Sequence, residues 1–99
     1  MNDCYSIYLD KAALNDISES VDYYEKQQKG LGDKFIEAVE DKFSILEKNP
    51  FFAIRYDNVR CVPLKTFPFL IHYTISSQEK KLIIRAVFHT SKNPNWSNR

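Results

Sequence analysis

The amino-acid sequence predicts an α+β fold in which two helices pack on one face of an antiparallel sheet. The chain has 99 residues, which suits a single domain. Its first half carries apolar residues at helical spacing, whereas its second half consists of runs of β-branched and aromatic residues between short polar stretches. Because helices and strands are grouped apart along the chain, the helices are expected to lie together on one side of the sheet. We expect one domain over residues 1–99, in which residues 90–99 form a polar C-terminal tail.

The first half predicts a short strand followed by a hairpin of two helices. Residues 5–9 are rich in strand formers, and Asp10 and Asp33 are candidate N-caps for the two helices. Gly30 suits the left-handed position after the first helix, and Pro50 ends the second. The apolar stripes of the two helices are Leu14, Ile17, Val21 and Tyr24, and then Phe35, Val39, Phe43 and Leu46. The short turn between the helices implies that they run antiparallel.

The second half predicts three or four strands. The candidate runs are residues 54–56, 59–65, 69–75 and 81–89. Short polar turns connect these runs, which favours antiparallel neighbours. One face of the sheet should meet the helices, and the open face is where a functional site is expected.

Side chains of the last run alternate between the two faces of the sheet. The more apolar row consists of Leu82, Ile84, Ala86 and Phe88, and we expect this row to meet the helices. Arg85 and His89 then point together toward the open face. A register slip of one residue would move any of these side chains to the other side of the sheet.

The charges of the chain are distributed unevenly between its halves. Residues 1–50 hold six Lys or Arg and eleven Asp or Glu, a net charge of −5. Residues 51–99 hold eight Lys or Arg and two acids, a net charge of +6. A basic half on a small domain indicates a polyanionic or acidic partner. The alternative is that helices merely collect acids on their solvated faces, which explains the acidic half better than the basic one.

Several function classes are not indicated by the sequence. The N-terminus lacks a basic stretch followed by an apolar run, and the longest apolar runs are far shorter than the ~20 residues that span a bilayer. We therefore expect a cytoplasmic protein without membrane contact, in which Cys4 and Cys61 are reduced thiols. Two histidines and two scattered cysteines lack metal-ligand spacing, and no Gly-rich phosphate loop is present. We expect no metal and no cofactor.

An ordered set of short motifs runs along nearly the whole chain. The helical half contributes Tyr23-Tyr24, Gly30-Leu31-Gly32-Asp33-Lys34-Phe35 and Asn49-Pro50. The second half contributes Val59-Arg60, Phe67-Pro68-Phe69, Arg85-Ala86-Val87-Phe88-His89, Asn93-Pro94 and Trp96. No single motif is diagnostic, but their order in a chain of this length resembles the RelE/ParE superfamily of bacterial toxins.

The resemblance implies a toxin of a type II toxin–antitoxin system, of the kind found in plasmid stabilisation, which a cognate antitoxin neutralises. The superfamily has two activities on one fold. RelE-like members are ribonucleases that cut mRNA in the ribosomal A site, whereas ParE-like members inhibit DNA gyrase and need no catalytic residues. The sequence leaves both open, so the expected partners are the antitoxin and either the ribosome with its mRNA or DNA gyrase. A non-toxic module that binds only its antitoxin is a third alternative.

If the protein is a ribonuclease, specific residues are candidates for its catalytic site. Cleavage of RNA by its 2′-hydroxyl needs a proton acceptor, cations that stabilise charge on the phosphate, and an acid for the leaving oxygen. Arg60 and Arg85 resemble the strand arginines that RelE-like enzymes use for charge stabilisation. His89 is the candidate acid or base, because imidazole is the side chain that ordinarily titrates near neutral pH. The candidates for binding nucleic acid or a protein partner are Lys65, Lys92 and Trp96.

Two departures from the family pattern weaken the ribonuclease alternative. No tyrosine follows Tyr73, so the C-terminal tyrosine of some RelE-like enzymes is missing. No general-base carboxylate can be placed on the open face. The alternative also requires Arg60 and Arg85 to share that face, whereas a purely structural role would pair them with acids and leave His89 as the end of a strand.

Overall fold

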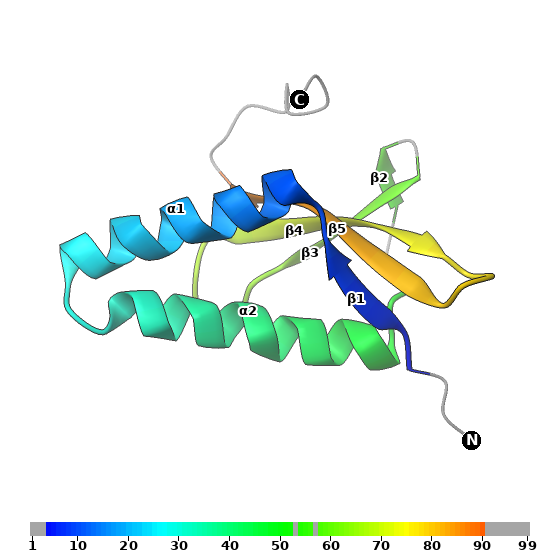
Figure 1. Ribbon diagram of the computed structural model, residues 1–99, viewed down its shortest axis with the longest axis horizontal. Coiled ribbons are helices and arrows are strands. Elements are labelled where there is room, and N and C mark those ends of the chain that lie inside the picture. Colours follow the sequence, from blue (N-terminus) through cyan, green and yellow to red (C-terminus); the bar gives the residue numbers. More distant parts are fainter. Residues whose placement is uncertain (1–3, 53, 57, 91–99) are drawn as a thin grey trace.

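The computed structural model describes residues 4–52, 54–56 and 58–90. Its elements are β1 (Ser6–Leu9), α1 (Lys11–Gln27), α2 (Leu31–Lys48), β2 (Ile54–Tyr56), β3 (Val59–Pro63), β4 (Phe69–Ser76) and β5 (Lys81–His89). The predicted α+β class is therefore confirmed, with its N-terminal strand, helical hairpin and following sheet (Figure 1). Neither of the two described helices is long and apolar enough to cross a bilayer.

Helix α1 begins where the sequence predicts. The side chain of Asp10 accepts a hydrogen bond from the backbone N–H of Ala12 at 3.1 Å, which caps the first turn. The apolar stripe starts one residue earlier than predicted, because Ala13 is fully buried whereas Leu14 is 54% exposed. Ala13 keeps helical spacing with Ile17 and Val21. The buried face of α1 therefore begins at Ala13 instead of Leu14, and the predicted residues Ile17 and Val21 still belong to it.

A tight turn joins α1 to α2. Gly30 adopts the predicted left-handed conformation, with a φ of 89°. Helix α2 starts at Leu31, so Asp33 lies in its first turn and the prediction that Asp33 is the N-cap is wrong. The first N–H groups of a helix have no acceptor within the helix. At the start of α2 the carboxylate of Glu25 serves as this acceptor, since it takes hydrogen bonds from the backbone N–H groups of Gly30 and Gly32, each at 3.0 Å.

The strands form one sheet in the order β1-β5-β4-β3-β2. Strands β2 to β5 are antiparallel to their sequence neighbours, as predicted. Strand β1 pairs in parallel with β5, which makes the sheet mixed. A parallel pair needs a long connection, and here both helices and three strands separate β1 from β5 along the chain.

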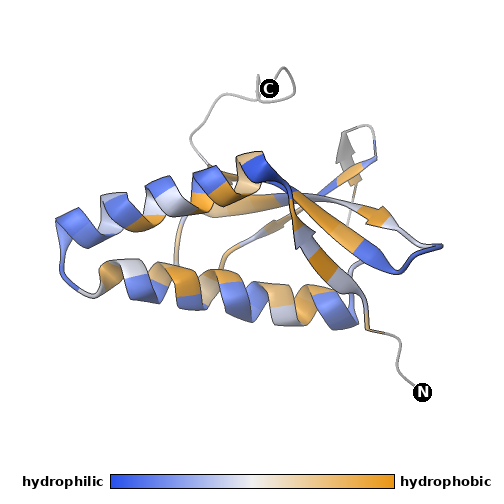
Figure 2. Cartoon of the chain, in the orientation of Figure 1, coloured by the Kyte–Doolittle hydropathy of each residue, from blue (hydrophilic) through white to orange (hydrophobic). Residues whose placement is uncertain are grey.

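The hydrophobic core lies between the sheet and the helical hairpin, which covers one face of the sheet (Figure 1). Figure 2 shows hydrophobic residues recurring along α2, β4 and β5, whereas most of α1 is hydrophilic. The side chains that are fully buried in this core are Ala13, Phe35, Leu46, Ile71, Tyr73, Leu82 and Ile84. The predicted packing of the helices on one face of the sheet is thus confirmed.

Among the residues that the structure describes, Tyr73 is the largest fully buried side chain, and it carries a polar group into the core. Its hydroxyl donates a hydrogen bond to the carbonyl of Pro50 at 2.6 Å, which ties β4 to the chain after α2. Burial raises the pKa of Tyr73 above the ordinary value of 10.0. The hydroxyl therefore stays protonated in the folded state when an unfolded tyrosine begins to ionise.

The variant Tyr73→Phe is predicted to lower the free energy of unfolding at pH 7 by about 1–2 kcal/mol, because the carbonyl of Pro50 loses its donor. A raised folded-state pKa contributes stability below the unfolded pKa, and that contribution is lost as pH rises through the folded pKa. The difference between wild type and variant should therefore shrink above about pH 10. Urea denaturation at pH 7 and pH 10.5 measures it, and a difference that grows with pH would contradict this assignment.

Candidate functional site

A β-bulge in β5 determines which side chains lie on each face of the sheet. His72 pairs with Ala86, but the next residue of β4, Tyr73, pairs with Ile84. Arg85 is therefore an extra residue in β5. An extra residue inverts the alternation of the side chains that follow it.

The inversion corrects the predicted faces of β5 after the bulge. Ala86 and Phe88 were predicted to meet the helices, but they lie on the other face, where the ring of Phe88 is 5.5 Å from that of His72. Val87 belongs to the core cluster instead. His89 packs edge-on against Phe69 on the helix side, with ring centroids 5.2 Å apart. The prediction that Arg85 and His89 share the open face is therefore wrong for His89.

Arg85 itself lies on the open face, as predicted. Its Nε donates to the hydroxyl of Thr74 at 3.3 Å, and Thr74 alternates with the buried Tyr73. Its Nη1 forms an ion pair with the carboxylate of Asp10 at 3.4 Å, and the Arg85 side chain is 45% exposed. Such an exposed pair contributes little to stability, so its main effect is to orient the guanidinium.

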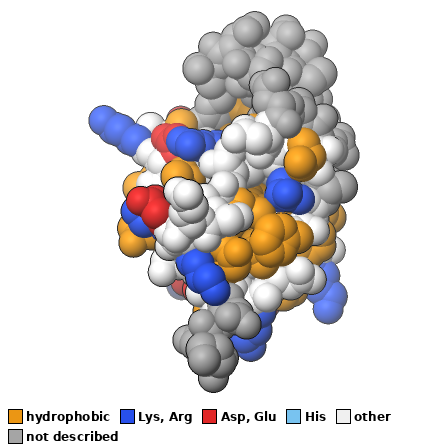
Figure 3. All heavy atoms as spheres, turned by 90° about the vertical axis from the view of Figure 1, so that its right-hand side faces the viewer, with side chains coloured by type: hydrophobic (Ala, Val, Ile, Leu, Met, Phe, Trp, Pro, Cys, Tyr) orange, Lys and Arg blue, Asp and Glu red, His pale blue; other side chains and the backbone are white. Residues whose placement is uncertain are grey.

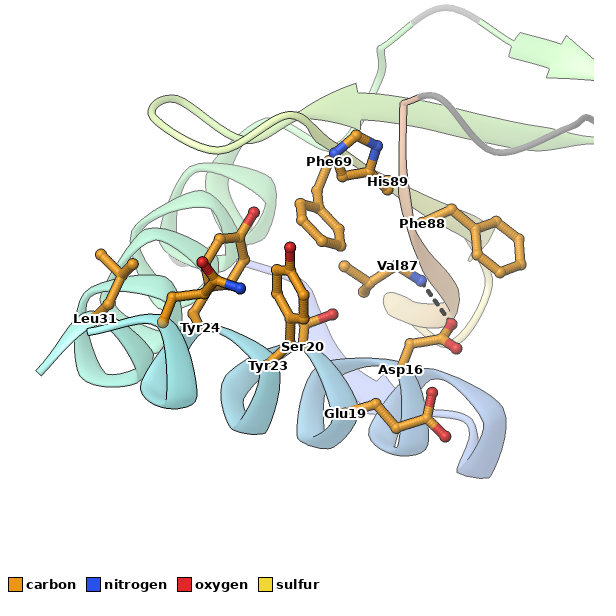
Figure 4. Close-up of a pocket in the computed structure, with 11 residues that line it drawn as sticks. Asp16, Glu19, Ser20, Tyr23, Tyr24, Leu31, Phe69, Val87, Phe88 and His89 are labelled. Atoms are coloured by element: carbon orange, nitrogen blue, oxygen red, sulfur yellow. Dashed lines mark hydrogen bonds between the residues drawn. The ribbon is translucent and has the colours of Figure 1, made fainter. Parts of the chain in front are cut away.

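A second carboxylate of α1 holds the backbone of β5 directly after the bulge. Asp16 Oδ2 accepts a hydrogen bond from the N–H of Val87 at 3.0 Å (Figure 4). On the other side of the bulge, the N–H of the N-cap residue Asp10 donates to the carbonyl of Ile84 at 3.0 Å. Asp10 and Asp16 thus connect the backbone on both sides of the bulge to the start of α1.

Arg60 lies on the opposite face of the sheet from Arg85. In the register of the sheet Arg60 is the partner of Tyr73, whose side chain is buried beneath the helices. Its guanidinium donates to the carbonyl of Phe52 and lies 5.5 Å from the ring centroid of Phe51. No ion pair joins Arg60 to an acid in the part of the chain that the structure describes.

His89 lies beside a groove between α1 and the end of β5 (Figure 4). The groove has a volume of about 540 Å³. Its walls include Asp16, Glu19, Tyr23 and Tyr24 from α1 and Phe69 from β4. The combination of aromatic rings and two carboxylates distinguishes this groove from the basic character of the second half of the chain.

Tyr24 and Tyr23 both line this groove, Tyr24 half-buried and Tyr23 exposed. The ring of Tyr24 lies 4.9 Å from Phe67 and 5.5 Å from Phe35. Burial raises the pKa of Tyr24, and the neighbouring Tyr23 adds to the effect. Tyr23 is 59% exposed, with its ring 5.3 Å from that of Tyr24. The motif Tyr23-Tyr24 therefore supplies one packing residue and one surface residue.

The remaining candidates lie elsewhere. Lys65 is exposed in the loop between β3 and β4, beside a second hollow next to α2. Lys92 and Trp96 lie outside the described residues. The structure thus places Arg60, Arg85, His89 and Lys65 at four separate positions. Within residues 4–52, 54–56 and 58–90, no group of three His, Cys, Asp or Glu side chains could hold a metal ion.

The fold is that of the RelE/ParE class of toxins. A chain in the structure of the chromosomal ParDE toxin–antitoxin system from P. aeruginosa matches with a TM-score of 0.76 at 16% identity, over 91% of this chain and 100% of that one. The RelBE2 toxin–antitoxin complex from Mycobacterium tuberculosis matches with a TM-score of 0.63 at 15% identity, over 90% and 94%. The isolated E. coli RelE toxin matches with a TM-score of 0.65 at 13% identity, over 95% and 93%.

The family follows from the sequence comparison. The family model described as the ParE toxin of the type II toxin-antitoxin system, parDE, matches residues 7–94. Because this match covers most of the chain, the chain belongs to the ParE toxin family and is a toxin of a type II toxin–antitoxin system, as the resemblance implied. Its partner is accordingly an antitoxin. A search of the curated proteins found no match.

The variant Asp16→Ala is predicted to loosen β5 after the bulge, because the N–H of Val87 loses its acceptor. The loss of one such hydrogen bond costs about 1–2 kcal/mol, which corresponds to roughly tenfold faster amide exchange. Hydrogen exchange followed by NMR at Val87 measures this change. The exposed Asp22 of α1 provides the control Asp22→Ala, and equal exchange at Val87 in both variants would refute the role of Asp16.

Proposed function

We propose that this toxin arrests growth by binding and inhibiting DNA gyrase, and not by cutting mRNA. The observation that supports the proposal most strongly is the position of Arg60 and Arg85 on opposite faces of the sheet. Two guanidinium groups stabilise charge on one phosphate only when both reach its oxygens at about 3 Å. A sheet that separates them prevents such joint binding.

The position of His89 supports the same proposal. A general acid or base has to lie within hydrogen-bond reach of the proton that it transfers. His89 packs against Phe69 on the helix side of the sheet, whereas Arg85 lies on the open face. The three candidate catalytic residues therefore share no reaction centre in this fold. A ribonuclease activity would require either a rearrangement of β5 that brings these residues together or a catalytic site made of other residues.

Inhibition by binding requires only a suitable surface. On the open face at the β1 edge, Tyr8 is 50% exposed and Lys81 Nζ lies 5.0 Å from its ring centroid. Arg85 lies four residues after Lys81 in β5. Tyrosine and arginine are the residue types that most often contribute strongly to binding at protein interfaces. Figure 3 shows hydrophobic side chains beside Lys and Arg on the side of the molecule that it views. We propose that Tyr8, Lys81 and Arg85 form the target-binding patch.

The proposal is tested with purified toxin in two parallel assays. We expect inhibition of supercoiling by gyrase with accumulation of cleaved DNA–gyrase complexes, and intact mRNA on translating ribosomes. The charge reversal Lys81→Glu should weaken the inhibition about tenfold, as loss of an interface contact does. The matched control is Lys29→Glu, because Lys29 is exposed in the turn between the helices. Circular dichroism verifies that both variants fold.

Two outcomes would reject the gyrase proposal. Cleavage of mRNA that is abolished by Arg60→Ala and by Arg85→Ala would establish the ribonuclease alternative. Normal growth of bacteria in which the toxin alone is induced would support the module that only binds an antitoxin.

A further inference from the structure

One face of α1 is composed differently from the rest of the helix. Residues at spacings of three and four, namely Asp16, Glu19, Ser20, Tyr23, Tyr24 and Gln27, all line the groove beside His89. The core stripe of the same helix, with Ala13, Ile17 and Val21, points to the sheet. The groove face is therefore a separate surface of α1, and only Tyr24 serves both the groove and the core.

The Asp, Glu, Lys and Arg side chains that line the groove are all acidic. Asp16 and Glu19 contribute carboxylates, and no Lys or Arg is among the described residues that line the groove. Glu19 is exposed and has no ion-pair partner in the described part of the chain. An anionic ligand such as a nucleic acid would be repelled here, whereas a cation would be attracted.

The aromatic rings in the groove select the kind of cation. Tyr23 and Tyr24 form an edge-to-face pair, and Figure 4 shows Tyr23 rising from α1 on the same side as Phe69 and His89. A flat guanidinium group stacks on such rings and donates to carboxylates at the same time. An ammonium group is more strongly hydrated and has no plane to stack. A wholly apolar side chain would pack on the rings but would give the carboxylate of Glu19 no donor.

We propose that this groove binds an arginine side chain, flanked by apolar residues, on a segment of a partner protein. The guanidinium stacks against Tyr23 and donates to Glu19, while the flanking residues cover Leu31 and Phe69. The groove lies on the helix side of the sheet, so it is separate from the patch of Tyr8, Lys81 and Arg85. The inference does not depend on whether gyrase is the target.

The experiment is an NMR titration of the full chain with the blocked tripeptide acetyl-Leu-Arg-Leu-amide. We expect saturable shifts at Glu19, Tyr23, Tyr24 and His89, and much weaker binding of the analogue in which neutral citrulline replaces arginine. Glu19→Gln and Tyr23→Leu should each weaken binding about three- to tenfold, as expected for the loss of one charge or one cation–π contact. Both positions are exposed, so the fold should tolerate these changes.

The matched control is Glu40→Gln, which removes an exposed carboxylate of α2 that does not line the groove. Equal affinity for the citrulline peptide, or equal weakening by Glu40→Gln, would overturn the proposal. A peptide-independent dimer in sedimentation velocity that Tyr23→Leu abolishes would assign the groove to a second copy of the chain and would also overturn it. Loss of citrulline discrimination in Glu19→Gln would support the guanidinium–carboxylate contact directly.

Discussion

Two hydrogen bonds to the start of the first helix hold the final strand on either side of its bulge. The N–H of Asp10 donates to the carbonyl of Ile84, and the carboxylate of Asp16 accepts from the N–H of Val87. The faces on which the side chains of β5 lie depend on this bulge. The extra residue at Arg85 directs Val87 and His89 toward the helices and Ala86 and Phe88 away from them. Without the bulge, strict alternation would place Arg85 and His89 on one face.

The molecule has two chemically different surfaces. The open face carries cations that are partly satisfied by neighbouring acids, Lys81 by Glu79 at 3.6 Å and Arg85 by Asp10. The groove beside α1 combines aromatic rings with the carboxylates of Asp16 and Glu19. A toxin that acts by binding can use two such surfaces for different partners. A ribonuclease that used Arg60, Arg85 and His89 would need these groups to converge on one point, whereas Arg85 lies on the other face of the sheet from Arg60 and His89.

Much of the fold could be predicted from the sequence, because hydrophobic periodicity reports which face of an element is buried. The element order, the hairpin, the left-handed Gly30 and the position of α1 after Asp10 all follow from local patterns. The capping by Glu25 was missed, because its carboxylate reaches N–H groups five and seven residues further along. The parallel pairing of β1 with β5 depends on contacts across the whole chain, which no local pattern reports.

The candidate site could be predicted far less well, since one inserted residue reverses a face. The apolar run Ala86-Val87-Phe88 is the one local sign of the bulge, because a strand with a single buried face alternates. Arg60 could not be placed without the register that pairs it with Tyr73. The groove was missed because Asp16, Glu19 and Tyr23 look like ordinary polar positions on an amphipathic helix until Phe69 and His89 lie across from them.

The most direct test of the account is a set of nuclear Overhauser effects from the side chains of β5 in the full chain. The bulge predicts contacts of the His89 ring with Phe69 and of the Phe88 ring with His72, whose centroids are 5.2 Å and 5.5 Å apart. Contacts of Phe88 with the buried side chains of α1, together with His89 on the same face as Arg85 and Thr74, would show regular alternation and contradict the account.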